Sequence, residues 1–150
     1  MHVRQARDSD ATAIARLSCE LAGHVADPDP GLDISELMEL GFGDSTWFDC
    51  LVAEVDSELV GFALYCKRFE AHTRSRKLWL GDLVVAKRHR RQGVGAMLVK
   101  ALRARALDLK CDGIVLELWV QNATARDFYK KAGAELDAEL EIHLIPISAG

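Results

Sequence analysis

Apolar residues that alternate or run together mark the strands predicted by this sequence. Seven segments have this pattern at strand length: 2–6, 48–55, 59–66, 78–85, 114–120, 135–136 and 139–145. The connection 56–58 is short enough to join its two neighbours as an antiparallel hairpin. Residues 67–76 are predicted to form a basic loop, and turn residues predict a second loop at 27–31.

Capping residues and apolar positions at helical spacing predict four helices. They are a helix after an N-cap at Asp8 or Ser9, a short helix between Asp33 and Gly41, a long helix over about 93–109, and a helix from Asn122 that Gly133 terminates. Strand-helix-strand units in the second half imply parallel pairing there, while the hairpin is antiparallel. The order of elements therefore predicts an α/β (α+β) fold with one mixed sheet flanked by helices.

Length and composition restrict the class of protein. The 150 residues suit one domain, so we expect residues 1–150 to fold as a single unit. No run approaches the eighteen apolar residues of a membrane helix, and the charged start of the chain does not fit a secretory signal. The four cysteines and five histidines lack metal-ligand spacing. We therefore expect a cytoplasmic protein with reduced thiols, no metal and no membrane partner.

The formal net charge of −4 hides two opposed blocks. Residues 17–66 contain eleven acidic side chains and no Lys or Arg, whereas residues 67–110 contain thirteen Lys or Arg and three acidic side chains. The basic block has little aromatic interleaving and matches no nucleic-acid-binding module, so we expect no nucleic-acid partner. Such asymmetry instead suggests charged ligands of both signs.

The segment 84–98 has the pattern of an anion site, because a strand runs into a basic turn that opens a helix. The first amides of a helix lack internal partners, and the helix dipole favours negative charge there. Gly93 and Gly95 let the backbone approach a phosphate, and Arg90 and Arg91 add cationic donors. The alternative interpretation is an ordinary helix start with a solvated basic turn. The segment lacks the third glycine of a dinucleotide fingerprint and the G-K-[ST] of a P-loop.

Two motifs resemble those of the GCN5-related N-acetyltransferase (GNAT) superfamily. The first is Arg90-Arg91-Gln92-Gly93-Val94-Gly95, which matches [QR]-x-x-G-x-[GA]. The second is Asn122 with the segment 128–134, FYKKAGA, which resembles the family's "N…FY…GA". The resemblance covers nearly the whole chain in element order. It implies a mixed sheet of about six to seven strands with splayed central parallel strands, flanked by about four helices.

The same resemblance implies an enzyme that uses acetyl-CoA and releases coenzyme A. The pyrophosphate would lie on the amides of the turn, and the pantetheine arm would pair with the strand before it. By position, the implied cofactor-binding residues are Leu83, Val84, Val85, Arg90, Arg91, Gln92, Gly93, Val94, Gly95, Ala96 and Asn122.

Direct transfer of acetyl to an amine needs a base for the ammonium and an acid for the departing thiolate. Tyr129 matches the family's general-acid tyrosine, and an ordinary tyrosine hydroxyl, with a pKa of about 10, is protonated at neutral pH. Asp82 and Glu117, the latter expected on the strand 114–120, are the candidates for orienting or deprotonating the ammonium.

The segments 41–44, 50–55 and 60–65 look like the spermidine/spermine (diamine) N-acetyltransferase branch, which is homodimeric. In that branch a glutamate stands where this chain has Gly81, and an aromatic-rich stretch replaces the basic residues of 67–77. Candidate cation-facing residues are Asp27, Asp29, Asp33, Glu36 and Glu39. The resemblance therefore implies an acceptor that is the primary amine of a small molecule, such as a polyamine or diamine, an amino acid or a related amine. A CoA-binding relative with little or no activity, or a protein amine acetyltransferase, is the alternative.

Overall fold

Five strands form one mixed sheet whose spatial order follows the order of the sequence. The structure, a computed structural model, describes residues 1–24 and 32–147, so the predicted loop at 27–31, with Asp27 and Asp29, lies outside the described residues. The strands are β1 His2–Gln5, β2 Asp49–Val55, β3 Glu58–Glu70, β4 Ser75–Val85 and β5 Gly113–Leu116. The first three pairings are antiparallel and β4 pairs with β5 in parallel, as the element order predicts.

Four α-helices accompany the sheet in the described part of the chain. They are α1 Ala11–His24, α2 Ile34–Phe42, α3 Val94–Asp108 and α4 Ala123–Lys131. Asp33 caps α2 by accepting a hydrogen bond from the amide of Glu36 at 2.7 Å, although the helix ends at Phe42 and not at Gly41. A 3-10 turn at Asp8–Asp10 precedes α1, so neither Asp8 nor Ser9 is the N-cap. No helix of the described residues is long and apolar enough to cross a membrane.

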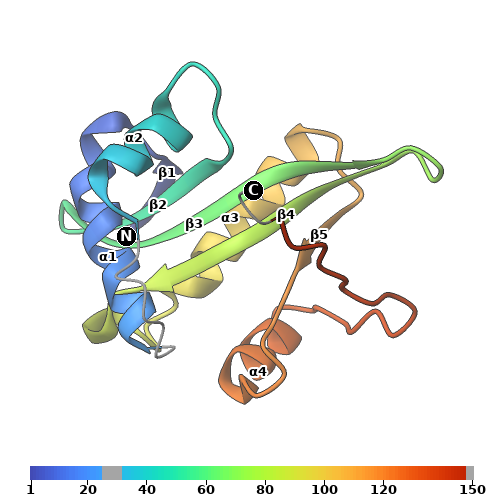
Figure 1. The fold of residues 1–150 in the computed structure, drawn as a ribbon. Helices are drawn as coiled ribbons and strands as arrows, with labels where there is room; N and C mark the ends of the chain where they lie inside the picture. The colour runs from blue at the N-terminus through green and yellow to red at the C-terminus, as the bar shows by residue number, and fades with distance from the viewer. Residues whose placement is uncertain (25–31, 148–150) are drawn as a thin grey trace. The chain divides into compact units, whose positions relative to one another are not determined.

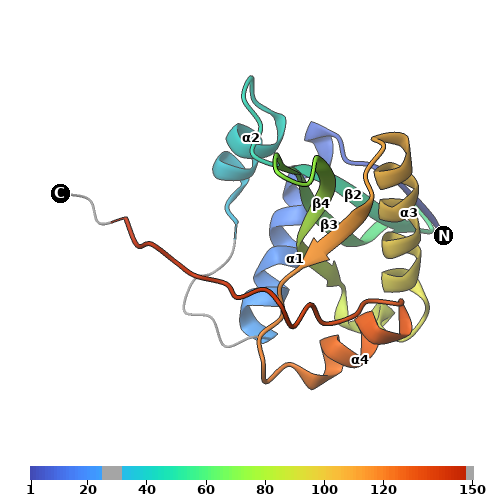
Figure 2. The same ribbon diagram turned by 90° about the vertical axis from the view of Figure 1, so that its right-hand side faces the viewer.

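The contacts divide the chain into two compact units, Met1–Glu117 and Leu118–Gly150. In the first unit, α1 and α2 lie on one face of the sheet and α3 lies on the other (Figure 2). The core beneath α1 and α2 includes Ile14, Leu17, Leu37, Phe62 and Val84. On the opposite face, α3 buries Val94, Leu98, Leu102 and Ala106, and Gly61 of β3 lets Val94 and Leu98 approach the sheet.

A β-bulge in β4 changes which face its residues occupy. Leu64 pairs with Asp82 and the next residue of β3, Tyr65, pairs with Leu80, so Gly81 is left between the two pairs. Leu64 and Tyr65 are consecutive residues of β3 and point to opposite faces, so their partners face opposite sides as well. Asp82 therefore shares the face of Leu64, which belongs to the core beneath α1 and α2.

The parallel pair β4–β5 is short. It runs from Lys77 opposite Gly113 to Leu80 opposite Leu116, and β4 then continues to Val85. Among the described residues, no strand pairs with 81–85 on the side away from β3. This arrangement agrees with the expected separation of the central parallel strands.

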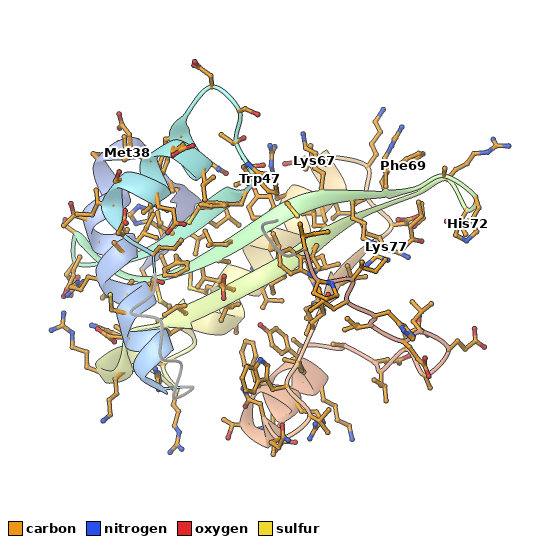
Figure 3. The ribbon with its side chains drawn as sticks, viewed as in Figure 1. Met38, Trp47, Lys67, Phe69, His72 and Lys77 are labelled. Carbon is orange, nitrogen blue, oxygen red and sulfur yellow. The ribbon has the colours of Figure 1, made fainter. Side chains whose placement is uncertain are left out.

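The predicted basic loop at 67–76 is wrong, because β3 and β4 continue through most of it. They form a hairpin arm that extends past the other strands (Figure 1), with pairs from Lys67 opposite Leu78 to Glu70 opposite Ser75. Lys67, Phe69, His72 and Lys77 lie along this arm (Figure 3). At the turn end of the arm, Ser75 donates to the carboxylate of Asp112 at 3.0 Å. The cross-strand pairing outweighs the local polar pattern.

The sheet has five strands, fewer than the six to seven expected. The predicted strands at 135–136 and 139–145 are absent from the described residues 134–147. Their apolar side chains are exposed, including Leu136, Ile142 and Leu144. A strand needs a paired neighbour for its backbone groups, which an alternating pattern alone does not supply.

Candidate active site

Backbone and side-chain hydrogen bonds hold the turn that connects β4 to α3. The amide of Ala86 donates to the carbonyl of Val60 at 2.8 Å, and Arg90 Nε donates to the carbonyl of Val85 at 3.0 Å. Within the turn, Gln92 Nε2 donates to the carbonyl of Arg88 at 2.9 Å. These bonds hold the start of α3 at the end of β4 before any ligand binds.

Gly93 sits at the entrance to α3 in a left-handed conformation, with φ of 84°. A Cβ atom placed on Gly93 would meet no atom of the described residues within 4 Å, so the space beside Gly93 is open. The internal hydrogen bonds of α3 begin with the amide of Met97, which donates to the carbonyl of Gly93 at 3.0 Å. The amides just before it, at residues 94–96, are the ones that a helix leaves unsatisfied. A helix start of this kind favours an anionic group such as a phosphate.

The cations of the turn are not equivalent. Arg88 forms an ion pair with Glu58, and Glu20 of α1 accepts a hydrogen bond from the backbone amide of Lys87 at 3.3 Å. Arg91, which is exposed and has a positive φ of 61°, has no ion-pair partner among the described residues. The positive potential available to an anion therefore comes mainly from Lys87, Arg90, Arg91 and the helix start, and less from Arg88.

The end of β4 adjoins this turn and contains Leu83, Val84 and Val85. On one side these residues pair with β3, as shown by Val85 opposite Gly61. Their other side faces no strand among the described residues, because the pairing with β5 ends at Leu80. The backbone of this stretch is thus suited to pair with an extended ligand that contains amides.

Asp82 lies just ahead of this stretch on the face of α1 and α2. Its side chain is half-buried, and burial raises the pKa of its carboxyl above the ordinary value. No hydrogen bond or ion pair engages the carboxylate within the described residues. A raised pKa makes a carboxylate a stronger base, and an uncommitted carboxylate can contact a ligand.

The remaining predicted site residues follow β5 in the sequence. Glu117 is exposed and follows the last residue of β5, so its expected place on a strand is wrong. In the second unit, Asn122 caps α4 by accepting a hydrogen bond from the amide of Ala125 at 3.0 Å. Tyr129 lies on α4 with its ring edge-on to Phe128, the ring centroids being 4.9 Å apart.

The sequence reasoning missed Trp79, which lies beside this site. The ring of Trp79 covers Gly81, since a Cβ atom on Gly81 would lie 2.7 Å from Trp79 Cζ3. Trp79 and Gly81 are two residues apart on a predicted strand, a spacing that places them on one side, but the contact itself depends on the bulge.

The family model described as Acetyltransferase (GNAT) family matches residues 12–134. The chain belongs to this family. A thialysine N-epsilon-acetyltransferase from Bos taurus is 34% identical over 149 residues, which cover 93% of this chain and 86% of that protein. The human spermidine/spermine N(1)-acetyltransferase-like protein 1 is 31% identical over 95% of this chain but only 22% of its own length.

Solved structures show the same GNAT fold. A crystal structure of a probable acetyltransferase superposes with a TM-score of 0.86 at 23% identity, covering 100% of both chains. The family, the fold and the resemblance to the diamine branch, all predicted from the sequence, are thereby confirmed. The chain is a GNAT-family N-acetyltransferase, and this family uses acetyl-CoA as its acetyl donor.

Proposed function

We propose that this GNAT enzyme transfers acetyl from acetyl-CoA directly to the primary amine of a small molecule. The observation that carries the proposal is the open, glycine-led start of α3 at the end of β4. The space beside Gly93 is open, and the adjoining β4 backbone is unpaired on one side. These two features lie next to Asp82, the half-buried carboxylate on the same strand.

The chain supplies separate groups for the two ends of the cofactor. The amides of Gln92, Gly93, Val94, Gly95 and Ala96, with Arg90 and Arg91, would hold the pyrophosphate. The backbone of 83–85 would pair with the pantetheine arm, and Asn122 would contribute the amide nitrogen that capping leaves free. Acetyl-CoA supplies a thioester whose carbonyl carbon is attacked by the acceptor nitrogen as the C–S bond breaks.

Proton transfers accompany this step, because the acceptor ammonium loses two protons on becoming an amide and the departing sulfur gains one. An amine arrives as an ammonium and must lose a proton before its nitrogen becomes a nucleophile. Asp82 would accept that proton, directly or through water, because burial raises the pKa of its carboxyl. Glu117 is the second candidate for this role. Tyr129 would donate the proton that the departing sulfur gains, and the second proton lost by the acceptor nitrogen would restore the tyrosine hydroxyl.

A cationic small molecule is the acceptor that the relatives and the charges support. The similar proteins are named for thialysine and for spermidine/spermine, which are amines. On this chain Asp33, Glu36 and Glu39 are exposed along α2. Their carboxylates would draw an ammonium toward the face of the sheet that carries Asp82.

We further propose that residues 1–150 act as one cytoplasmic domain and that the enzyme is a homodimer. The family match at 12–134 spans both compact units, which supports one functional domain. Exposed apolar side chains at Leu136, Ile142 and Leu144 support a dimer, because assembly would bury them.

The test is the release of coenzyme A thiol from acetyl-CoA with a panel of amines. The panel contains diamines, polyamines, lysine analogues, amino acids and a peptide with a free N-terminus. We expect turnover with a small primary amine and none with its N-acetylated form. A protein that binds acetyl-CoA but turns over none of these amines would be a CoA-binding relative, and turnover of the peptide alone would assign a protein acceptor.

A further inference from the structure

Trp79 occupies the space that a side chain at position 81 would need. A Cβ atom on Gly81 would lie 2.7 Å from Cζ3 and 3.0 Å from Cη2 of the indole, both too close for a real side chain. The indole of Trp79 therefore packs on the backbone of Gly81, immediately before Asp82, and this contact depends on the absence of a side chain at position 81.

The bulge brings Trp79 and Asp82 to the same face of the sheet. Residues three apart on a regular strand point to opposite faces. Here Trp79 pairs with Cys66 and Asp82 pairs with Leu64, and these two partners are themselves two residues apart on β3. Their side chains share a face, so those of Trp79 and Asp82 do as well. Both are half-buried, which leaves each of them partly accessible.

An indole and a carboxylate on one face form a binding surface for an organic cation. The face of a tryptophan ring attracts an ammonium more strongly than any other side-chain ring, and a carboxylate adds a full negative charge. Asp82 has no hydrogen-bond or ion-pair partner among the described residues, so its charge is available to a ligand. We propose that Trp79 and Asp82 together bind the ammonium of the acceptor and that Trp79 determines the specificity of the enzyme.

The next side chains along this face limit the site to one cation. Lys77 and Arg68 pair across the arm, and both form ion pairs with Glu70, at 3.2 and 3.1 Å. This cluster has two positive charges and one negative charge. A second ammonium on this face, placed from Trp79 toward Lys77, would lie near the net positive charge of this cluster and be repelled. The inference rests on the proposed amine acetylation, and it favours an acceptor with a single cationic centre near the reacting end.

The first experiment compares Trp79→Phe and Trp79→Leu in steady-state acetyl transfer. Removing the ring should raise KM for the amine about three- to thirty-fold, the range of a cation–π contact, while KM for acetyl-CoA stays unchanged. Trp79→Phe should lie between wild type and Trp79→Leu. Trp47→Leu is the matched control, since Trp47 is 77% exposed on the segment before β2 and lies outside the proposed site.

A second variant displaces the ring without removing it. Gly81→Ala places a methyl group where the indole lies, and it should raise KM for the amine as Trp79→Leu does. Gly113→Ala is its control, because the nearest atom to a Cβ there is Lys77 Cγ at 3.9 Å. Thermal unfolding of each variant separates loss of fold from loss of amine binding.

A binding measurement keeps this inference separate from the proposed function. The chain has three tryptophans, so Trp47→Phe with Trp119→Phe leaves Trp79 as the sole indole. Its fluorescence should change saturably with tetramethylammonium and less so after Asp82→Asn, with tert-butanol as the neutral control. If wild type acetylates no amine, the proposed function fails and this titration alone decides the inference. An unchanged KM for the amine in Trp79→Leu, or a titration without saturation, overturns the inference.

Discussion

Gly93 allows backbone strain and cofactor binding to be tested separately. The residue has φ of 84°, a conformation that costs an L-residue with a Cβ atom about 1–2 kcal/mol. Asparagine tolerates this conformation better than alanine does, because its short polar side chain bonds locally. The space beside Gly93 is open, so neither side chain would clash with the described residues. Any side chain there would instead occupy the proposed phosphate position.

Gly93→Ala and Gly93→Asn should therefore rank in opposite orders for loss of stability and for loss of affinity for coenzyme A. Gly93→Ala should lower the free energy of unfolding by about 1–2 kcal/mol, which is a fall in Tm of about 2–8 °C for a chain of this size. Gly93→Asn should lose less stability. A hydrogen bond to a charged group is worth about 1.5–3 kcal/mol, so blocking one raises the Kd for coenzyme A about ten- to a hundred-fold. The larger asparagine should have the larger effect on Kd.

Gly133 provides the matched control for strain. It has the same φ of 84° after the end of α4, so Gly133→Ala introduces similar strain at a residue that is not part of the β4–α3 turn. Calorimetric titration with coenzyme A gives Kd, and thermal unfolding gives Tm. We expect Gly133→Ala to lose stability and to retain its affinity for coenzyme A. If coenzyme A affinity follows Tm across the three variants, the anion site at Gly93 is refuted.

Three further predictions concern the proton transfers and the charges of the turn. Tyr129→Phe should lower kcat by about a hundred-fold or more with little change in KM for acetyl-CoA, and unchanged turnover would remove Tyr129 from the mechanism. Burial raises the pKa of the Asp82 carboxyl above its ordinary value of 3.8, so the folded state binds this proton more tightly than the unfolded state does. The free energy of unfolding therefore falls as the pH rises above 3.8. Asp82→Asn should thus be more stable than wild type in urea at pH 7, should lose this advantage toward pH 4, and should lose activity; equal stability at pH 7 would contradict the buried charge. Arg91→Ala should raise KM for acetyl-CoA about two- to five-fold, whereas Arg88→Ala should not, because Glu58 already pairs with Arg88; equal effects would contradict this distinction.

Features governed by local chemistry were predictable from the sequence. The N-caps at Asp33 and Asn122 accept the expected hydrogen bonds, and Gly93 has the positive φ that favours glycine at a tight turn. The turn before α3 was found for the same reason, since its glycines and arginines are adjacent in the chain. Each of these features needs only residues within one or two turns of a helix.

Features governed by pairing between distant residues were not predictable in this way. Residues 67–76 have the polar composition of a loop, yet β3 and β4 pair through most of them. The bulge at Gly81 depends on how β3 and β4 align, and no local signal distinguishes it from a regular strand position. Because the bulge puts Trp79 on the face of Asp82, an aromatic contact at the site was invisible in the sequence.

The ion pairs of the structure decide which charges of the two blocks are available to ligands. Glu58 of the acidic block pairs with Arg88 of the basic block. Within the basic block itself, Glu70 pairs with Arg68 and Lys77. The charges that remain available to ligands lie at two places along β4. Arg91 and the start of α3 offer positive charge at one end of β4, and Asp82 offers negative charge on its face. An anionic cofactor and a cationic acceptor can therefore approach the same strand without competing for the same groups, as direct transfer between them requires.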